Sequence, residues 1–202
     1  MPVFQTRFTT GLLIGALATG LATATAASLA APSAARPATP PSVTAAASVS
    51  FHLTPSSKQL AKCMPKSDVD IKVSLTTDAV GFDTFAISAS GLRAKRAFTV
   101  FLLQRADSPF GAAEYIGDIT TDDKGHASNQ FRLIVQEAFS STLVNGKRVR
   151  VDLNRVGMWF AEPAGDDFCL GAGKGAVTPF DGDNEAGVQA FNSLKASALP
   201  AP

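Results

Sequence analysis

The segment Ala97–Val135 constrains the fold most strongly, because apolar residues alternate along it and turn residues interrupt it. Residues 98–103 are apolar on both faces of an extended chain, which predicts a strand in the middle of a sheet. Turn chemistry and period-two alternation predict further elements after it, in this order: a turn at 107–111, a strand over 115–121, a turn at 122–125 and a strand through Phe131, Leu133 and Val135.

Alternation of the same kind recurs on both sides of this segment. Residues 68–76 place apolar side chains on one face and polar ones on the other, and residues 85–90 repeat the pattern. Asn145-Gly146 is the strongest hairpin signal, because both residues tolerate positive φ. The remaining expectations are a helix over 56–62 capped by Thr54, a short helix or bulged strand over 135–143, inward-facing Val149, Val151 and Leu153, a strand over 155–162 and a helix over 187–195.

About seven short strands separated by turn residues, with no long amphipathic helix, predict the fold class. We expect an all-β protein built as a single antiparallel β-sandwich. No repeat of about 20–50 residues is present, so the sequence does not favour a solenoid or a propeller.

The domain organisation follows from composition. Residues 1–30 carry Arg7 and then a short apolar run with small residues, which predicts a secretory signal peptide. A transmembrane anchor is disfavoured, because glycine, alanine and threonine dilute the apolar run. Residues 31–50 are rich in Ala, Pro, Ser and Thr and predict a disordered linker. The folded domain is expected over 51–195, followed by a flexible tail at 196–202.

The charge balance excludes some partners. Apart from Arg7 and Arg36, which precede the expected domain, the chain has 16 basic and 17 acidic side chains. A nearly neutral domain gives no electrostatic basis for binding nucleic acid, and no membrane span is expected once the signal peptide has been removed.

Cys63 and Cys169 are the two cysteines of the chain. An exported protein with one cysteine pair is most simply explained by a structural disulfide. A redox pair or a metal site is disfavoured, because the sequence lacks the C-x-x-C spacing and histidines near the cysteines. The expected location is therefore secreted, extracellular or associated with the cell wall.

Several turn and strand residues form a pattern over 91–125. The residues concerned are Gly91-Leu92, Ala97-Phe98-Thr99-Val100, Gly117, Thr121-Asp122 and Gly125. This pattern resembles small secreted bacterial β-sandwich modules of the immunoglobulin or fibronectin III type. It departs from them at 93–96, where Arg-Ala-Lys-Arg replaces the usual proline. The resemblance implies an Ig-like sandwich and no particular activity.

A second set of residues matches a P-F-G … Y-x-G-D-I-x-T-D pattern. Its members are Pro109-Phe110-Gly111, Tyr115, Gly117-Asp118-Ile119 and Thr121-Asp122. The pattern resembles uncharacterised exported proteins of the actinobacterial type, which implies export but no activity.

Catalytic residues are few. The histidines are His52 and His126, and His126 follows an acidic turn in which it could pair with Asp123. No GxSxG, HExxH or P-loop pattern occurs, so we favour reading His126 as a solvent-exposed residue at the start of a strand. The competing class is a small secreted hydrolase that uses His126 with Asp122 and Asp123.

Acidic residues alternate at Asp181, Asp183 and Glu185, which suggests a Ca²⁺ site on a loop. The EF-hand pattern fails there, because Ala186 and Asn192 occupy the sixth and twelfth positions. The alternative is a solvated acidic loop. Calcium is the one cofactor that the sequence suggests.

Candidate binding residues are aromatic or basic. Trp159 lies opposite Val156, Met158 and Phe160, so it either contacts a ligand from the outer face or lies in a strand buried on both faces, which we favour. Phe110 is a second candidate aromatic residue. Basic groups cluster at Arg93, Lys95 and Arg96 and again at Lys147, Arg148 and Arg150.

Together these features predict an exported, non-enzymatic binding or structural module at the cell surface or in the medium. Its expected partner is a cell-wall polymer, a glycan or a protein. The basic clusters could contact an anionic wall polymer if they lie on one side of the domain, and the alternative, which we favour, is that they are solvated faces. The alternative is the secreted hydrolase or a calcium-dependent protein that uses the 181–185 loop.

Overall fold

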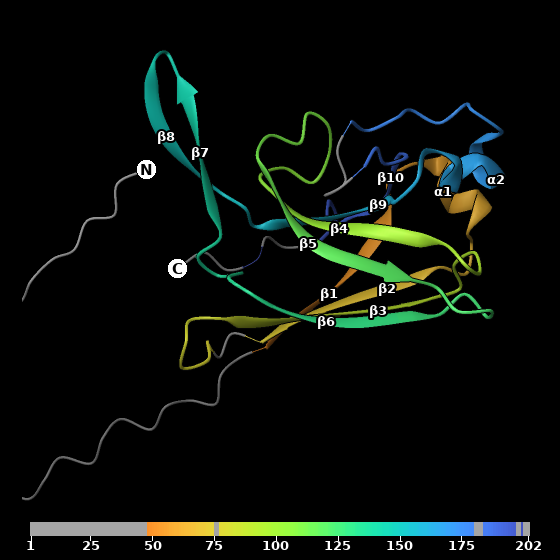
Figure 1. Cartoon of the computed structure of the whole chain (residues 1–202), viewed down its shortest axis with the longest axis horizontal. Coiled ribbons are helices and arrows are strands. Elements are labelled where there is room, and N and C mark those ends of the chain that lie inside the picture. The colour runs from red at the N-terminus through yellow and green to blue at the C-terminus, as the bar shows by residue number, and fades with distance from the viewer. Residues whose placement is uncertain (1–47, 75–76, 180–183, 197–198, 200–202) are drawn as a thin grey trace, which may run out of the picture. The chain divides into compact units, whose positions relative to one another are not determined.

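The computed structural model describes residues 48–74, 77–179, 184–196 and 199 (Figure 1). All of them belong to one compact unit, Ser42–Pro202. The expected signal peptide lies outside the described residues, as does the expected linker up to residue 47.

The described part of the chain is all-β with short helical segments. In chain order the elements are β1 Ser48–Pro55, α1 Lys58–Cys63, β2 Asp68–Ser74, β3 Asp83–Ser90, β4 Ala97–Leu103, β5 Ala113–Thr120, β6 Ala127–Leu133, β7 Phe139–Val144, β8 Lys147–Asp152, β9 Arg155–Phe160, the 3-10 turn Pro163–Asp166, α2 Asp167–Leu170 and β10 Gln189–Asn192. The alternation over 68–74, 85–90 and 98–103 therefore predicted strands correctly, and β3 begins two residues earlier than expected. Residues 75 and 76 of the first expected strand lie outside the described residues.

Eight strands follow one hydrogen-bonded order, β5-β4-β9-β10-β1-β2-β3-β6, and every neighbouring pair is antiparallel. Strand β1 connects two layers, because Ser48–Leu53 pair with β2 whereas Thr54 and Pro55 pair with β10. Figure 1 shows β2, β3 and β6 as one layer and β4 and β5 as the layer that faces it. The antiparallel β architecture is thus confirmed, with more strands than expected and with the two layers joined through β1.

The core lies between these layers. Val69, Ile71 and Val73 of β2 are completely buried, and so is Phe85 of β3. They share one apolar cluster with side chains from the opposite layer, namely Phe98, Val100, Leu102, Val156, Met158 and Phe160. Burial of a large apolar side chain contributes about 1.5–3 kcal/mol, so this interface is the main source of stability.

Strands β4 and β9 are buried on both faces. On their outer face Phe101, Leu103, Trp159 and Ala186 form a second apolar cluster, and Phe110 packs against it. Trp159 is 3% exposed. The preferred reading, that both faces of this strand are buried, is correct.

Strands β5 and β6, which stand at the two ends of the hydrogen-bonded order, lie next to each other. Gly117 lies at a register shift in β5 and has a φ of 153°. A Cβ atom there would lie 2.4 Å from the Phe131 ring of β6, so the close approach requires glycine. The Asn129 amide of β6 also donates a hydrogen bond to the Asp118 carbonyl oxygen of β5 at 3.2 Å.

The predicted disulfide is present. Cys63 at the end of α1 and Cys169 in α2 are bonded, with their Cα atoms 5.5 Å apart. The helix cap differs from the prediction, because Thr54 and Pro55 remain in β1 and Ser57 accepts the hydrogen bond from Leu60 N instead. Gln59 Nε2 donates to the Cys169 carbonyl oxygen at 3.2 Å and adds a second link between the two helices.

Three further expectations were wrong. Residues 189–192 form β10 rather than part of a helix, because they fill the gap between β9 and β1. Residues 48–50 begin β1 rather than end a linker. Leu199, expected in a loose tail, is 3% exposed, and its N–H donates to the Asn154 carbonyl oxygen at 2.9 Å.

Candidate functional site

Strands β7 and β8 form a two-stranded sheet of their own, which projects away from the layers in Figure 1. Asn145 and Gly146 both have positive φ at its tip, as the hairpin prediction requires. At its base, Leu153 N donates to the Ala138 carbonyl oxygen at 2.9 Å, and both of these residues are buried. The two chain segments that lead into the hairpin are therefore hydrogen-bonded to each other where they leave the core.

Residues paired across the hairpin share a face, and the two faces differ. One face pairs Thr142 with Val149 and Val144 with Lys147. Val149 is 41% exposed and Val144 is 50% exposed. The expectation that Val149 and Val151 point into the core was wrong, because the hairpin leaves the layers at this point; Leu153 is buried as expected.

The opposite face of the hairpin is cationic and aromatic. Arg150 lies 4.1 Å above the ring of Phe139 and contacts Asp152 at 3.0 Å. Arg148 is paired with Leu143, which is 70% exposed. Isolated two-stranded hairpins are at most marginally stable in water. An element that exposes both apolar and cationic side chains in this way has the properties of a contact surface.

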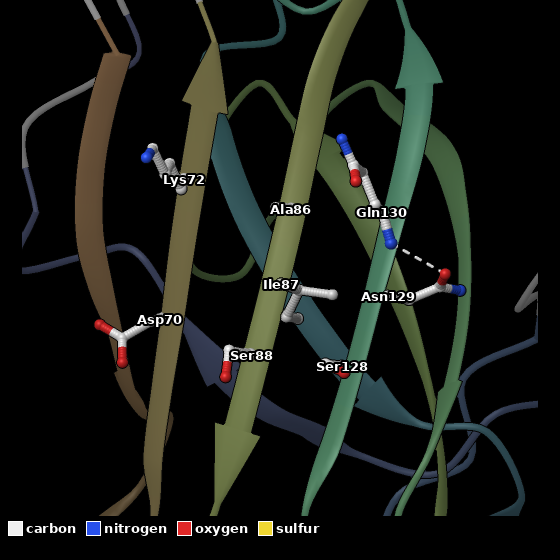
Figure 2. Close-up of a pocket in the computed structure, with 8 residues that line it drawn as sticks. All are labelled: Asp70, Lys72, Ala86, Ile87, Ser88, Ser128, Asn129 and Gln130. Atoms are coloured by element: carbon white, nitrogen blue, oxygen red, sulfur yellow. Dashed lines mark hydrogen bonds between the residues drawn. The ribbon is translucent and has the colours of Figure 1, made fainter.

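A shallow groove with a mixed apolar and polar lining crosses the outer face of β2, β3 and β6 (Figure 2). In Figure 2, side chains from three adjacent strands line it, including Lys72, Ser88, Ser128 and Gln130. A neighbouring groove shares Ser88 and Ser128 and continues to His126. The lining offers hydroxyl, amide and amine groups, which suit hydrogen bonding to a polar ligand.

The candidate aromatic residues contact each other. Phe110 lies edge to face on Trp159, with ring centroids 5.0 Å apart, and Phe101 lies 5.4 Å from the same indole. A pocket of about 140 Å³ adjoins these rings and is also lined by Leu103, Gly111, Ala113 and Thr178. Trp159 is therefore a packing residue whose ring is covered by the 104–112 loop.

The first basic cluster does not act as one group. The guanidinium carbons of Arg93 and Arg96 lie 5.6 and 5.9 Å from the ring centroid of Phe168. Lys95 forms an exposed ion pair with Asp123 at 2.9 Å. Two of these three basic residues thus support the segment that carries Cys169.

The acidic turn before His126 has a structural role. Asp122 Oδ1 accepts hydrogen bonds from His126 N at 2.9 Å and Lys124 N at 2.7 Å. These backbone hydrogen bonds hold the pKa of Asp122 below its usual range. Asp123 is paired with Lys95 rather than with His126, so the structure does not assemble the expected acid–histidine pair.

The residues suggested for calcium are only partly described. Asp181 and Asp183 lie outside the described residues, and Glu185 is exposed. Nearby, Asp166 is fully buried, and Val188 N donates to its Oδ2 at 3.1 Å. Burial raises the pKa of this carboxyl group, and Gly175 and Gly187 pack closely against it.

Sequence analysis missed one cluster, in which His52 of β1 meets Asp68 and Asp70 of β2. Part of the signal was present, because Asp68 and Asp70 are two apart on one face of a predicted strand. The strand that carries His52 was not predicted. Register could not be read from the sequence, so the meeting of these side chains was not predicted.

Comparisons with protein-family models, curated proteins and solved structures gave no match to this chain. Among the described residues, no helix has both the length and the apolar character needed to cross a membrane.

Proposed function

We propose that the protein is an exported, non-enzymatic binding module, and that the β7–β8 hairpin contacts an anionic polymer of the cell envelope. One observation carries the proposal: a hairpin outside the core exposes Leu143, Val144 and Val149 beside Lys147 and Arg148. The fold does not require these apolar and basic side chains to be exposed, and exposed apolar groups with a polar rim are typical of a binding surface.

The charge distribution favours an anionic partner. Residues 139–152 hold three basic side chains and one acidic side chain, a net charge of +2. The rest of 51–202 holds 13 basic and 16 acidic side chains, a net charge of −3. The hairpin therefore concentrates positive charge on an otherwise acidic domain, and two copies would repel each other if their hairpins met.

The location follows from chemistry and from sequence together. A disulfide fits an oxidising compartment, and the predicted signal peptide and linker would place the domain outside the cell. The Gly91-Leu92 and Thr121-Asp122 motifs support an Ig-like ancestry as part of this proposal. The hydrogen-bonded order β1-β2-β3 differs from that of immunoglobulin domains, so the resemblance depends on those two motifs alone.

A deletion tests the contact element. Residues 139–152 are replaced by Asn-Gly between Ala138 and Leu153, whose backbones are already hydrogen-bonded. The variant should keep the cooperative unfolding transition of the wild type, because the core is untouched. Co-sedimentation with purified cell-wall sacculi should be lost. Undiminished sedimentation of the folded variant would disprove the role of the hairpin.

A charge reversal tests the anionic ligand. Lys147→Glu combined with Arg148→Glu should weaken co-sedimentation at least about 10-fold, because each phosphate contact contributes a salt-dependent term. The matched control, Lys58→Glu combined with Lys62→Glu, makes the same charge change on exposed positions of α1 and should bind as the wild type does.

The sacculi themselves provide the last arm of the test. Sacculi stripped of phosphodiester polymers should bind less protein than untreated ones, and binding to untreated sacculi should fall as salt concentration rises. Equal binding to both preparations would overturn the choice of an anionic polymer and would indicate a glycan or protein partner.

A further inference from the structure

The outer face of β1 and β2 brings together three side chains that ligate metals. His52 of β1 is the register partner of Asp70 of β2, and Asp68 lies two residues away on the same face of β2. His52 Nδ1 lies 3.0 Å from Asp68 Oδ1 and 3.0 Å from Asp70 Oδ1. One atom of each side chain lies within 4.8 Å of the other two.

These distances match the ligand spacing of a small divalent cation. Zinc binds imidazole nitrogen and carboxylate oxygen at about 2.0–2.2 Å. Two ligands at roughly 2.1 Å are ~3.4 Å apart at the tetrahedral angle that zinc prefers and ~3.0 Å apart at about 90°, and His52 Nδ1 lies 3.0 Å from each carboxylate oxygen. Because the three atoms already lie within 4.8 Å of one another, binding of a common cation requires adjustment of these exposed side chains and not of the strands.

A hydrogen bond alone explains this arrangement less well. A single Nδ1–H cannot point at Asp68 and Asp70 at the same time with good geometry. Both carboxylates are held near it by a regular pair of strands, since Leu53 and Val69 continue the same register. The strands therefore hold the backbone of all three metal-ligating residues on one side of the sheet.

We propose that His52, Asp68 and Asp70 form a binding site for a divalent transition-metal ion of the zinc or copper class. The imidazole ligand selects these ions over Ca²⁺ and Mg²⁺, which prefer all-oxygen sites. The side chains are 65%, 57% and 51% exposed, so the remaining coordination positions face solvent.

The site lies at the edge of the groove on β2, β3 and β6. Asp70 belongs both to the cluster and to the groove lining, where Figure 2 shows its carboxylate on the same face as Lys72 and Ser88. The site is remote in sequence from the β7–β8 hairpin, so its test is independent of the polymer-binding proposal.

The test uses the full chain without a polyhistidine tag and ZnCl₂ as the probe in isothermal titration calorimetry. We expect one Zn²⁺ per chain. Loss of an outer-sphere partner typically weakens metal binding ~10–100-fold, and loss of a direct ligand should weaken it further. We therefore expect His52→Gln and Asp70→Asn each to lower the affinity for Zn²⁺ by more than that factor. Both positions are exposed, so the variants should unfold like the wild type.

The matched control is His126→Gln, which alters the other histidine of the chain and should bind Zn²⁺ as the wild type does. Paramagnetic Cu²⁺ provides a second readout, because it should broaden the ring signals of His52 before those of His126. The absence of Zn²⁺ binding, or equal binding by His52→Gln and wild type, would overturn the proposal. A preference of the wild type for Ca²⁺ over Zn²⁺ would also overturn it.

Discussion

At the scale of single residues, Gly125 and Gly146 have almost the same backbone angle in different surroundings. Their φ values are 78° and 77°. A Cβ atom on Gly125 would lie 2.1 Å from the Leu92 carbonyl oxygen, whereas a Cβ on Gly146 would meet nothing within 4 Å. The pair separates the cost of backbone strain from the cost of a steric collision.

We predict that Gly146→Ala costs about 1 kcal/mol, which is the strain of an L-residue at positive φ. Gly125→Ala should cost clearly more, because the backbone of Leu92 has to move as well. Urea unfolding of the two variants measures the difference. Equal losses would contradict the close approach of Gly125 to Leu92.

Asp83 is a second residue whose chemistry is set by its surroundings. Burial alone would raise the pKa of this carboxyl group, which is 2% exposed. Hydrogen bonds from Gln136 N and Val135 N, both at 3.0 Å, and from Thr77 Oγ1 at 2.9 Å outweigh burial and lower the pKa.

A lowered pKa in the folded state predicts a direction of pH dependence. Asp83 stabilises the fold at pH values above the unfolded value of about 3.9, and this contribution is lost as pH falls through the lower folded pKa. Asp83→Asn should therefore cost about 1–3 kcal/mol at pH 7 and less at pH 2–3. Unfolding free energies at both pH values test this, and an equal loss at both would contradict it.

At the scale of elements, alternation predicted the strands that are half-buried and failed elsewhere. The D-V-D-I-K-V pattern of β2 shows its buried face directly. Strand β10 shows no such pattern, because all four of its residues are buried and two of them are polar. Gln189 and Asn192 satisfy each other there through an amide hydrogen bond of 3.1 Å, which depends on tertiary structure.

In the candidate sites, too, features set by local sequence were predictable and features set by tertiary structure were not. The hairpin turn was predictable because Asn145-Gly146 is a local signal, but its projection from the layers depends on where β9 returns to the sheet. The aromatic prediction was ambiguous, because a residue such as Trp159 looks the same in sequence whether a loop covers it or not.

The link between α1 and α2 carries a prediction of its own. Cys63→Ser combined with Cys169→Ser should lower the unfolding free energy by about 2–5 kcal/mol, because the bond closes a long loop in the unfolded chain. Thermal and denaturant unfolding measure the loss. Reduction of the wild type should produce a similar loss, and an unchanged midpoint in both cases would contradict the prediction.

At the scale of the whole molecule, stability should be uneven. Strands β2, β3 and β9 belong to the central core, whereas the β7–β8 hairpin pairs only with itself among the described strands. We predict that backbone amides of 140–151 exchange with solvent much faster than those of β2 and β3. Hydrogen exchange measures this, and equal protection would show that the hairpin is as firmly held as the core.

The covalent topology has a consequence for the exposed hairpin. Cys63 and Cys169 enclose the chain from α1 to α2, and the hairpin lies inside that ring. A protease that nicks the chain near Asn145 opens the ring without releasing either fragment. The cut protein would migrate as one piece until a reductant is added, so cleavage of the hairpin becomes visible only under reducing conditions.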